Sequence, residues 1–222
     1  MQIDLFKPQP KPFQYPHTEP PQTYEVVYAD PPWDYDGRTF LDGKVNDTGS
    51  ASDHYPTMKP QELMDMNIQH ICSKNCIMYM WTTGPQLDIS IDVLKAWGFK
   101  YKTIAFVWDK LVTNPGYYTM SQTELCIVGT KGAIPKPRGS RNERQFLQER
   151  RTRHSAKPKR VIQSLSRMHP TQNKIELFSR RAHPEWYCWG HGAKGNGTVV
   201  IPRLENKNIP DHIAKVMWPL PF

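Results

Sequence analysis

Short runs of β-branched, aliphatic and aromatic residues recur along the chain and are typical of buried strands. They occupy residues 24–29, 76–81, 101–108, 124–129, 174–178, 185–189 and 198–201. Between them, apolar residues recur at helical spacing and predict helices over 59–71, 87–97 and 158–168. Strands that alternate with helices predict an α/β fold, and such folds bind ligands at the carboxyl ends of their strands.

Three segments lack this periodicity. Residues 1–23 carry six prolines between Pro8 and Pro21 and are interpreted as an N-terminal arm, which leaves residues 24–222 as the folded domain. Residues 34–57 are rich in Gly, Asp, Ser and Thr, and a loop of this length is typical of a functional lid. Residues 131–160 are predicted to be a basic loop.

The composition fits one packed intracellular domain. Of the 222 residues, 38% are hydrophobic and 23% charged, which argues against global disorder. No apolar run approaches the roughly 20 residues of a membrane span, and the N-terminus lacks a secretory signal pattern. Four scattered cysteines are too few for a disulfide framework, and Cys72 and Cys76 lack the second pair that a zinc site needs. We therefore expect reduced thiols, no metal and a cytoplasmic protein.

The positive charge is concentrated in the basic loop. The whole chain carries a net charge of +8, whereas residues 131–160 contain eleven Lys and Arg residues opposed only by Glu143 and Glu149. A single segment that holds the entire excess suggests a polyanionic partner such as nucleic acid. A solvated loop with no partner is the alternative, and the charge alone does not separate the two.

The segment Asp30-Pro31-Pro32-Trp33 directly follows the first predicted strand, where an α/β fold places reactive groups. Its two prolines fix the backbone and lack N–H donors, so rigid carbonyl acceptors lie beside the Asp30 carboxylate. Two acceptors can hold both hydrogens of an exocyclic amino group, and a tryptophan can stack on the attached ring. This arrangement directs the nitrogen lone pair at an electrophile, which is catalysis by positioning. The alternative is a strand-terminating turn with Trp33 in the core.

Six further segments follow this one in an order shared with a known family. They are Tyr55-Pro56-Thr57-Met58, Trp81-Thr82-Thr83-Gly84, Trp108-Asp109-Lys110, residues 124–132, His154-Ser155-Ala156-Lys157-Pro158 and residues 175–180. Together they resemble the MT-A-70-like N(6)-adenine methyltransferases, which include the catalytic subunit of the eukaryotic messenger-RNA adenosine methyltransferase and smaller bacterial and phage enzymes acting on DNA. The resemblance covers about residues 24–192, and it depends on the order and spacing of the segments.

The resemblance implies a Rossmann-like methyltransferase fold in permuted motif order, with a mixed seven- to eight-stranded sheet and helices on both faces. It implies S-adenosylmethionine as cofactor and Asp30, Pro31, Pro32 and Trp33 as the catalytic segment. Asp30 would accept from the target amino group and lie near the cofactor amine, and Pro31 would supply a carbonyl. The implied cofactor-binding residues are Asp30, Lys157, Glu176, Phe178, Arg180, His183 and His191. The residues assigned to the substrate are Tyr35, Trp81, Trp108, Lys110 and Glu124, with Arg144 and Arg151 placed on phosphates.

Two features depart from the family pattern. Gly190-His191-Gly192 stands where the nucleotide enzymes have Gly-Asn-Gln or Gly-Asn-Glu, although a histidine can still hydrogen-bond a ribose hydroxyl or the adenine edge. No counterpart of the family's upstream adenine-contacting aspartate precedes Tyr24.

The expected function is therefore S-adenosylmethionine-dependent methylation of adenine N6 in nucleic acid. We rank DNA ahead of RNA and expect a bacterial or phage source, because the chain is little more than a catalytic domain and lacks the zinc-finger extension of the eukaryotic RNA enzymes. Two alternatives stay open, an RNA adenosine methyltransferase and a catalytically silent nucleic-acid-binding subunit. The protein could act as a homodimer or as one of two paired subunits, and the intact Asp30-Pro31-Pro32-Trp33 argues against silence.

Overall fold

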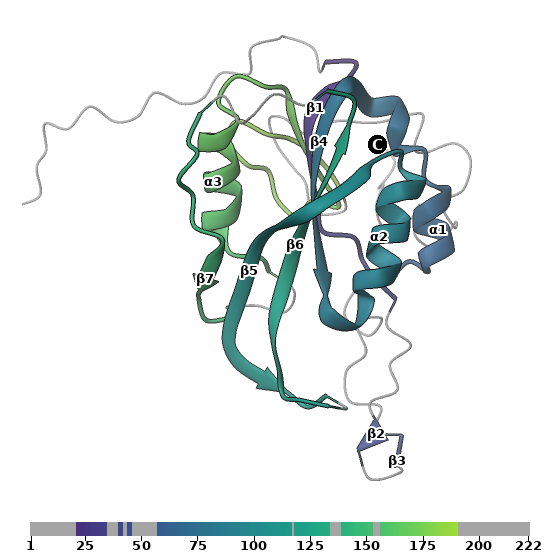
Figure 1. Ribbon diagram of the computed structural model, residues 1–222, viewed down its shortest axis with the longest axis vertical. Coiled ribbons are helices and arrows are strands. Elements are labelled where there is room, and N and C mark those ends of the chain that lie inside the picture. The colour runs from purple at the N-terminus through teal and green to yellow at the C-terminus, as the bar shows by residue number, and fades with distance from the viewer. Residues whose placement is uncertain are drawn as a thin grey trace, which may run out of the picture.

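One seven-stranded sheet runs through the part of the chain that the computed structural model describes, which is residues 21–34, 40–41, 44–45, 57–116, 118–133, 139–152 and 156–190 (Figure 1). In spatial order its strands are β7 (Phe146–Gln148), β5 (Lys100–Asn114), β6 (Ser121–Lys131), β4 (Cys72–Thr83), β1 (Tyr24–Ala29), β8 (Lys174–Leu177) and β9 (Tyr187–Trp189). The predicted strand at 198–201 and most of the N-terminal arm lie outside the described residues.

The sheet contains both parallel and antiparallel pairs, because one strand, β6, runs opposite to the others. β6 pairs antiparallel with both β4 and β5, whereas β1 runs parallel to β4 and β8, β8 to β9 and β5 to β7. The ends of β1, β4 and β8 therefore lie at one edge of the sheet, together with the beginning of β6. Because Glu124 pairs with Thr83 in this register, an acidic residue from β6 reaches the edge where β4 ends.

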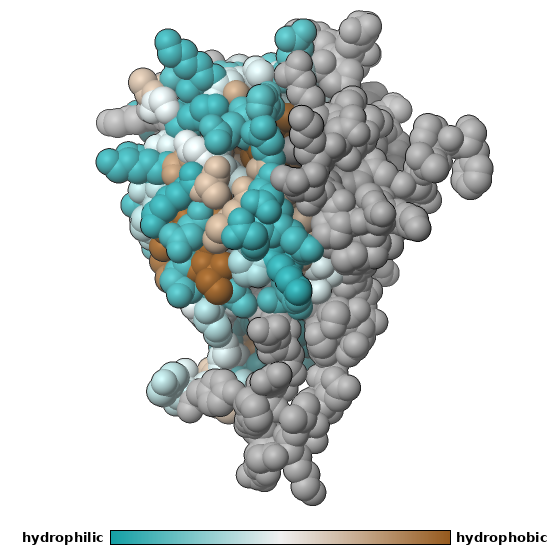
Figure 2. Space-filling view, turned by 90° about the vertical axis from the view of Figure 1, so that its right-hand side faces the viewer, coloured by the Kyte–Doolittle hydropathy of each residue, from teal (hydrophilic) through white to brown (hydrophobic). Residues whose placement is uncertain are grey.

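Helices cover both faces of the sheet. α1 (Pro60–Asp65) and α2 (Leu87–Ala96) pack on one face, and α3 (Lys159–Met168) packs on the other (Figure 1). The connections through α1 and α2 run from β1 towards β5, whereas the connection through α3 runs back to β8. Connections between two parallel strands of one sheet are almost always right-handed. Connections that move along the sheet in opposite directions therefore place their helices on opposite faces. The described part of the surface on the α1 and α2 side is mainly hydrophilic, with some hydrophobic residues among the polar ones (Figure 2). No helix among the described residues could span a membrane.

The predicted end of the second helix is confirmed in detail. Gly98 has φ +83°, a conformation that glycine adopts without strain. The Gly98 N–H donates to the Lys95 carbonyl at 2.8 Å, and the Phe99 N–H donates to the Leu94 carbonyl at 3.1 Å. This pair of bonds is a Schellman cap, which satisfies carbonyls that the helix end would otherwise leave unpaired.

The prediction of one helix over residues 59–71 is wrong. α1 ends at Asp65, and a separate 3₁₀ turn, η2 (Ile68–Ile71), follows it. A continuing helix would pair the Leu63 carbonyl with the N–H of residue 67. That carbonyl instead accepts the indole N–H of Trp97 at 2.6 Å and the Met66 N–H at 3.2 Å. Packing of α1 against the end of α2 therefore stops the helix.

Two predicted loops contain strands. β2 (Phe40–Leu41) and β3 (Lys44–Val45) form an antiparallel pair within the predicted lid. Within residues 131–160, β7 adds a parallel edge strand to β5. Leu147 of β7 is 3% exposed and packs into the core, which holds this short strand in place although its neighbours are exposed. A second 3₁₀ turn, η3 (Gly84–Gln86), follows β4.

Candidate active site

The segment Asp30-Pro31-Pro32-Trp33 leaves β1 at the carboxyl edge of the sheet and is pinned by Met58. The Met58 N–H donates to the Pro32 carbonyl at 2.7 Å, and the Asp34 N–H donates to the Met58 carbonyl at 3.0 Å. The Pro31 carbonyl accepts the Trp33 N–H at 2.9 Å. A carbonyl oxygen has two lone pairs, so this bond leaves Pro31 with the capacity to accept a second donor.

Four charged side chains form an alternating chain of ion pairs at this edge. Lys157 Nζ lies 2.8 Å from Asp30 Oδ1 and 3.2 Å from Glu124 Oε2. Glu124 Oε1 in turn lies 3.4 Å from Lys110 Nζ. All four side chains are mostly shielded from solvent, and Asp30 is the most exposed of them at 22%. The structure thus brings together residues from β1, β5, β6 and the segment before α3.

The two carboxyl groups in this chain respond differently to their surroundings. Burial raises the pKa of Asp30, and the neighbouring Lys157 ammonium opposes that rise. Burial also acts to raise the pKa of Glu124, but Lys157 and Lys110 together outweigh it and the net pKa is lowered. Lys157 is therefore the group that favours the ionised form of both acids.

Tryptophan side chains pack beside the ion-pair chain. Lys157 Nζ lies 5.7 Å from the centroid of the Trp81 ring, and Trp81 meets Trp108 edge to face at 6.2 Å. The Trp33 indole N–H donates to the Trp81 carbonyl at 3.2 Å. These three rings are at most 4% exposed, so they are part of the core of the site. That Trp33 packs on the base and that Trp81 and Trp108 line an adenine slot stays a prediction.

A second polar cluster lies at the end of β8, at the same edge of the sheet. Glu176 Oε2 lies 3.2 Å from His183 Nε2, and the Ser179 hydroxyl donates to the same carboxyl oxygen at 2.8 Å. Burial raises the pKa of Glu176 to about 7. Burial, with Arg181 and Lys159 nearby, lowers the pKa of His183 to about 4. Near pH 6 the pair therefore consists of a largely protonated carboxyl group and a neutral imidazole.

Phe178 and Arg180 flank this cluster in different environments. Phe178 has φ +60° and is 8% exposed, and its ring stacks on Trp97 and meets Trp189 edge to face. Arg180 is exposed. A Cβ at Gly190 would come within 2.4 Å of the Ser179 backbone nitrogen, so only glycine permits this close approach of the two strand ends.

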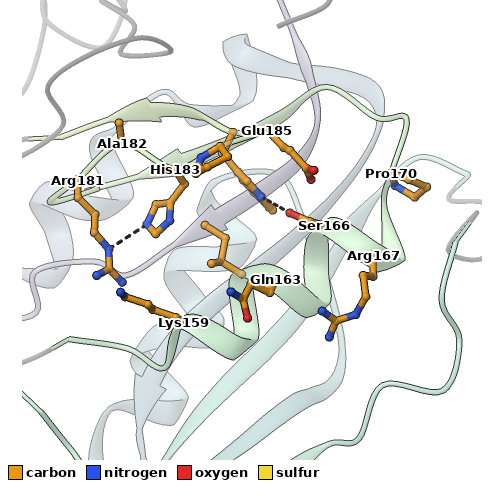
Figure 3. Close-up of a pocket in the computed structure, with 12 residues that line it drawn as sticks. Lys159, Gln163, Ser166, Arg167, Pro170, Arg181, Ala182, His183 and Glu185 are labelled. Carbon is orange, nitrogen blue, oxygen red and sulfur yellow. Dashed lines mark hydrogen bonds between the residues drawn. The ribbon is translucent and has the colours of Figure 1, made fainter. Parts of the chain in front are cut away.

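Two adjacent cavities open beside these clusters. One, of about 330 Å³, adjoins Lys157 and Trp108, and the other is a groove of about 720 Å³ between α3 and residues 181–186 (Figure 3). Lys159, Gln163 and Arg181 line both. Figure 3 shows Arg181 and Lys159 at one end of the groove and Arg167 and Pro170 at the other. The end near Lys157 thus carries two basic side chains, whereas Arg167 at the other end is paired with Glu143.

The predicted phosphate-binding arginines do not lie together. The Arg151 N–H donates to the Lys110 carbonyl at 3.3 Å, which places Arg151 beside the ion-pair chain. Arg144 precedes β7, which runs parallel to β5. Arg144 therefore lies at the opposite end of β7 from the ion-pair chain. Tyr35 and His191 lie outside the described residues.

Sequence reasoning missed two residues that shape the site. The Tyr28 hydroxyl accepts the Trp81 indole N–H at 2.6 Å, and its position on β1 next to the motif could have suggested this. Arg181 lines the cavity beside Lys157, together with Arg150 of the predicted basic loop. The contribution of Arg181 follows from tertiary packing and carries no local sequence signal.

The chain belongs to the MT-A70 family, whose model matches residues 24–192. This family membership and the Rossmann-like fold were both predicted, and both are confirmed. Among its relatives, the Type II methyltransferase M.MunI of Mycoplasma sp is 50% identical over 77% of this chain and 78% of its own length. An N(6)-adenosine-methyltransferase MT-A70-like protein of Arabidopsis thaliana is 27% identical over 78% of this chain. The human N(6)-adenosine-methyltransferase catalytic subunit METTL3 is 25% identical over 86% of it. The matches cover 24% of the plant protein and 32% of the human one.

Proposed function

We propose that this protein transfers a methyl group from S-adenosylmethionine to the N6 amino group of adenine in DNA. The observation that carries the proposal is the Asp30–Lys157 pair beside the rigid Pro31 carbonyl at the end of β1. A carboxylate and a carbonyl at this point can accept both hydrogens of an exocyclic amino group.

The residues at this edge fit S-adenosylmethionine, which when bound would supply the methyl group on an electrophilic sulfonium centre. Its amino-acid end carries one ammonium and one carboxylate, and Asp30 and Lys157 offer the opposite charges side by side. Glu176 can hold a ribose hydroxyl. In addition, Thr83 Oγ1 and Gln86 Oε1 at the end of β4 are buried without a hydrogen-bond partner among the described residues, as groups that await a ligand would be.

In the reaction, the protein's own groups position the acceptor and do not need to remove a proton beforehand. Asp30 and the Pro31 carbonyl hold the amino hydrogens, which directs the nitrogen lone pair away from the ring and towards the methyl donor. Lys157 favours the ionised form of Asp30 against the effect of burial, and Glu124 with Lys110 fixes Lys157 in place. The proton released after transfer can leave through Asp30 to solvent, since that side chain is partly exposed.

The similarity to known proteins favours DNA over RNA as the substrate. The relative with 50% identity, matched over most of its own length, is named as a type II methyltransferase. The relatives named for adenosine, a ribonucleoside, are matched over only about a quarter to a third of their lengths. The basic residues beside Lys157 are suited to phosphates of either polymer.

The test is transfer of labelled methyl groups to DNA and RNA strands of matched sequence, together with calorimetric titration of S-adenosylmethionine. We expect cofactor binding and preferential labelling of DNA. Preferential labelling of RNA would make the protein an RNA adenosine methyltransferase. Binding of nucleic acid without any transfer would identify a silent subunit and overturn the proposal.

A further inference from the structure

The hairpin of β5 and β6 extends well beyond the active-site edge. Trp108 pairs with Glu124 at the ion-pair chain, but β5 continues to Asn114 and β6 begins at Ser121. Figure 1 shows both strands projecting past the start of α2. We call residues 111–120 the hairpin arm, and all of them except residue 117 are described.

The hairpin arm exposes apolar side chains in a way that the rest of the described chain does not. Four large hydrophobic side chains are exposed among the described residues, and three of them lie on the arm: Leu111 at 47%, Tyr118 at 98% and Met120 at 58%. The sequence from 111 to 123 contains no charged residue. Exposed apolar side chains clustered at one functional edge indicate a surface that is covered by a partner.

The base of the arm is braced. Asp109 accepts hydrogen bonds from the Leu111 N–H at 2.9 Å, from Gln122 Nε2 at 2.5 Å and from Gln148 Nε2 at 3.0 Å. Leu111 has φ +55°, an unfavourable conformation for leucine, and the strand register is irregular between Asp109 and Asn114. The carboxylate thus holds an irregular turn that fixes the direction of the arm.

Positive charge lies at the base of the arm and not at its tip. The Glu149 N–H donates to the Asp109 carbonyl at 3.2 Å, and the Arg151 N–H donates to the Lys110 carbonyl at 3.3 Å. These bonds place Arg150 and Arg151 next to the point where the arm leaves the sheet. A duplex has the complementary arrangement, with phosphates outside and stacked apolar bases inside.

We propose that the hairpin arm is a wedge that enters duplex DNA beside the target adenine, with Tyr118 and Met120 filling the gap as the base leaves the stack. This inference rests on the proposed function. Extruding a base costs more free energy from a paired duplex than from a mismatched duplex or a single strand. Apolar side chains inserted between base steps are a known way of offsetting unstacking.

The test compares a paired and an unpaired substrate. Wild type, the double variant Tyr118→Ala/Met120→Ala and the control Phe146→Ala are assayed on one DNA sequence that the wild type methylates. Phe146 is 56% exposed but lies on β7 and off the arm. The three substrates are the perfect duplex, the duplex with an abasic site opposite the adenine, and the single strand.

We expect the double variant to lose about tenfold or more in kcat/KM on the perfect duplex and less than about twofold on the other two substrates. The control should match wild type on all three. Equal losses on all substrates, or no loss on any, would overturn the wedge. A lower mass of the double variant than of the wild type in analytical ultracentrifugation would also overturn it, because the arm would then contact a second copy of the chain. Absence of methylation by the wild type on all three substrates would instead count against the proposed function.

Discussion

At the scale of single residues, Lys157 organises the site. It contacts Asp30 and Glu124 and lies over the Trp81 ring. A buried cation shared by two acids is stable only while enough negative charge surrounds it. Asp30 can therefore be changed without leaving Lys157 unpaired, because Glu124 remains.

The first prediction concerns Asp30→Asn. Turnover should fall about 100-fold or more, because a positioned acceptor is removed, while the melting temperature stays within a few degrees of wild type. Asp92→Asn is the control, since Asp92 is exposed and pairs with Lys95 on the surface of α2. Retention of more than about a tenth of wild-type turnover by the Asp30 variant would show that Asp30 is not the acceptor.

The second prediction concerns Glu176 and pH. A carboxyl group with its pKa raised to about 7 in the folded state contributes stability below its unfolded pKa near 4.5, and this stability is lost as the pH rises through 7. His183 acts in the opposite direction up to about one pH unit above its unfolded pKa of 6.5, since its folded pKa is lowered to about 4. Between pH 6.5 and 8 the loss of stability through Glu176 is about 1 kcal/mol and the gain through His183 is roughly half of that, so the free energy of unfolding should fall by about half a kcal/mol. Denaturant titrations of Glu176→Gln should show no such fall, and an equal fall in the variant would assign it to another group.

At the scale of elements, the sequence was most informative where an element is long and regular. The helix over residues 87–97 and its glycine stop were predicted because spacing and cap are both local signals. β7 was missed because three residues among charged neighbours carry no pattern, and only Leu147 holds the strand against β5. The break after α1 was missed because its cause is the Trp97 side chain, which lies 34 residues from Leu63 in sequence.

Some residues of the candidate site could likewise be predicted from local sequence signals, and others could not. Asp30 could be found from sequence, because a polar residue after a buried strand lies at the carboxyl edge. That Glu124 and Lys110 meet Lys157 depends on the register of β4, β5 and β6, which no local pattern specifies. The β5–β6 extension was likewise missed, since its residues lack the apolar alternation of a strand packed on a core.

The third prediction concerns the segments on either side of β7. Arg150→Gln/Arg151→Gln should weaken binding to a short duplex and reduce the log–log salt slope by about 0.9 for each phosphate that the protein no longer neutralises. Arg144→Gln should have little effect on the short duplex and a measurable one only when the duplex is extended by about one helical turn, or ~10 base pairs. If Arg144→Gln weakened binding to the short duplex as much as Arg150→Gln/Arg151→Gln does, the result would contradict this arrangement.

At the scale of the whole molecule, the fold brings the proposed methyl-transfer site, a basic cavity and an apolar arm to one edge of a single sheet. The ion-pair chain lies where β1 and β4 end, and Arg150 and Arg181 line the cavity beside it. The hairpin arm leaves the same edge from β5 and β6. This convergence explains how a chain of 222 residues could bind a polymer and act on one base within it.

The most direct measurement is the position of the transferred methyl group. DNA methylated by the purified protein with labelled S-adenosylmethionine would be digested to nucleosides and separated by mass spectrometry. The account predicts that the label is in N6-methyl-2′-deoxyadenosine and that Asp30→Asn abolishes it. Label on a ring nitrogen or carbon, or in a cytosine nucleoside, would contradict the claim that Asp30 and the Pro31 carbonyl hold the exocyclic amino group of adenine.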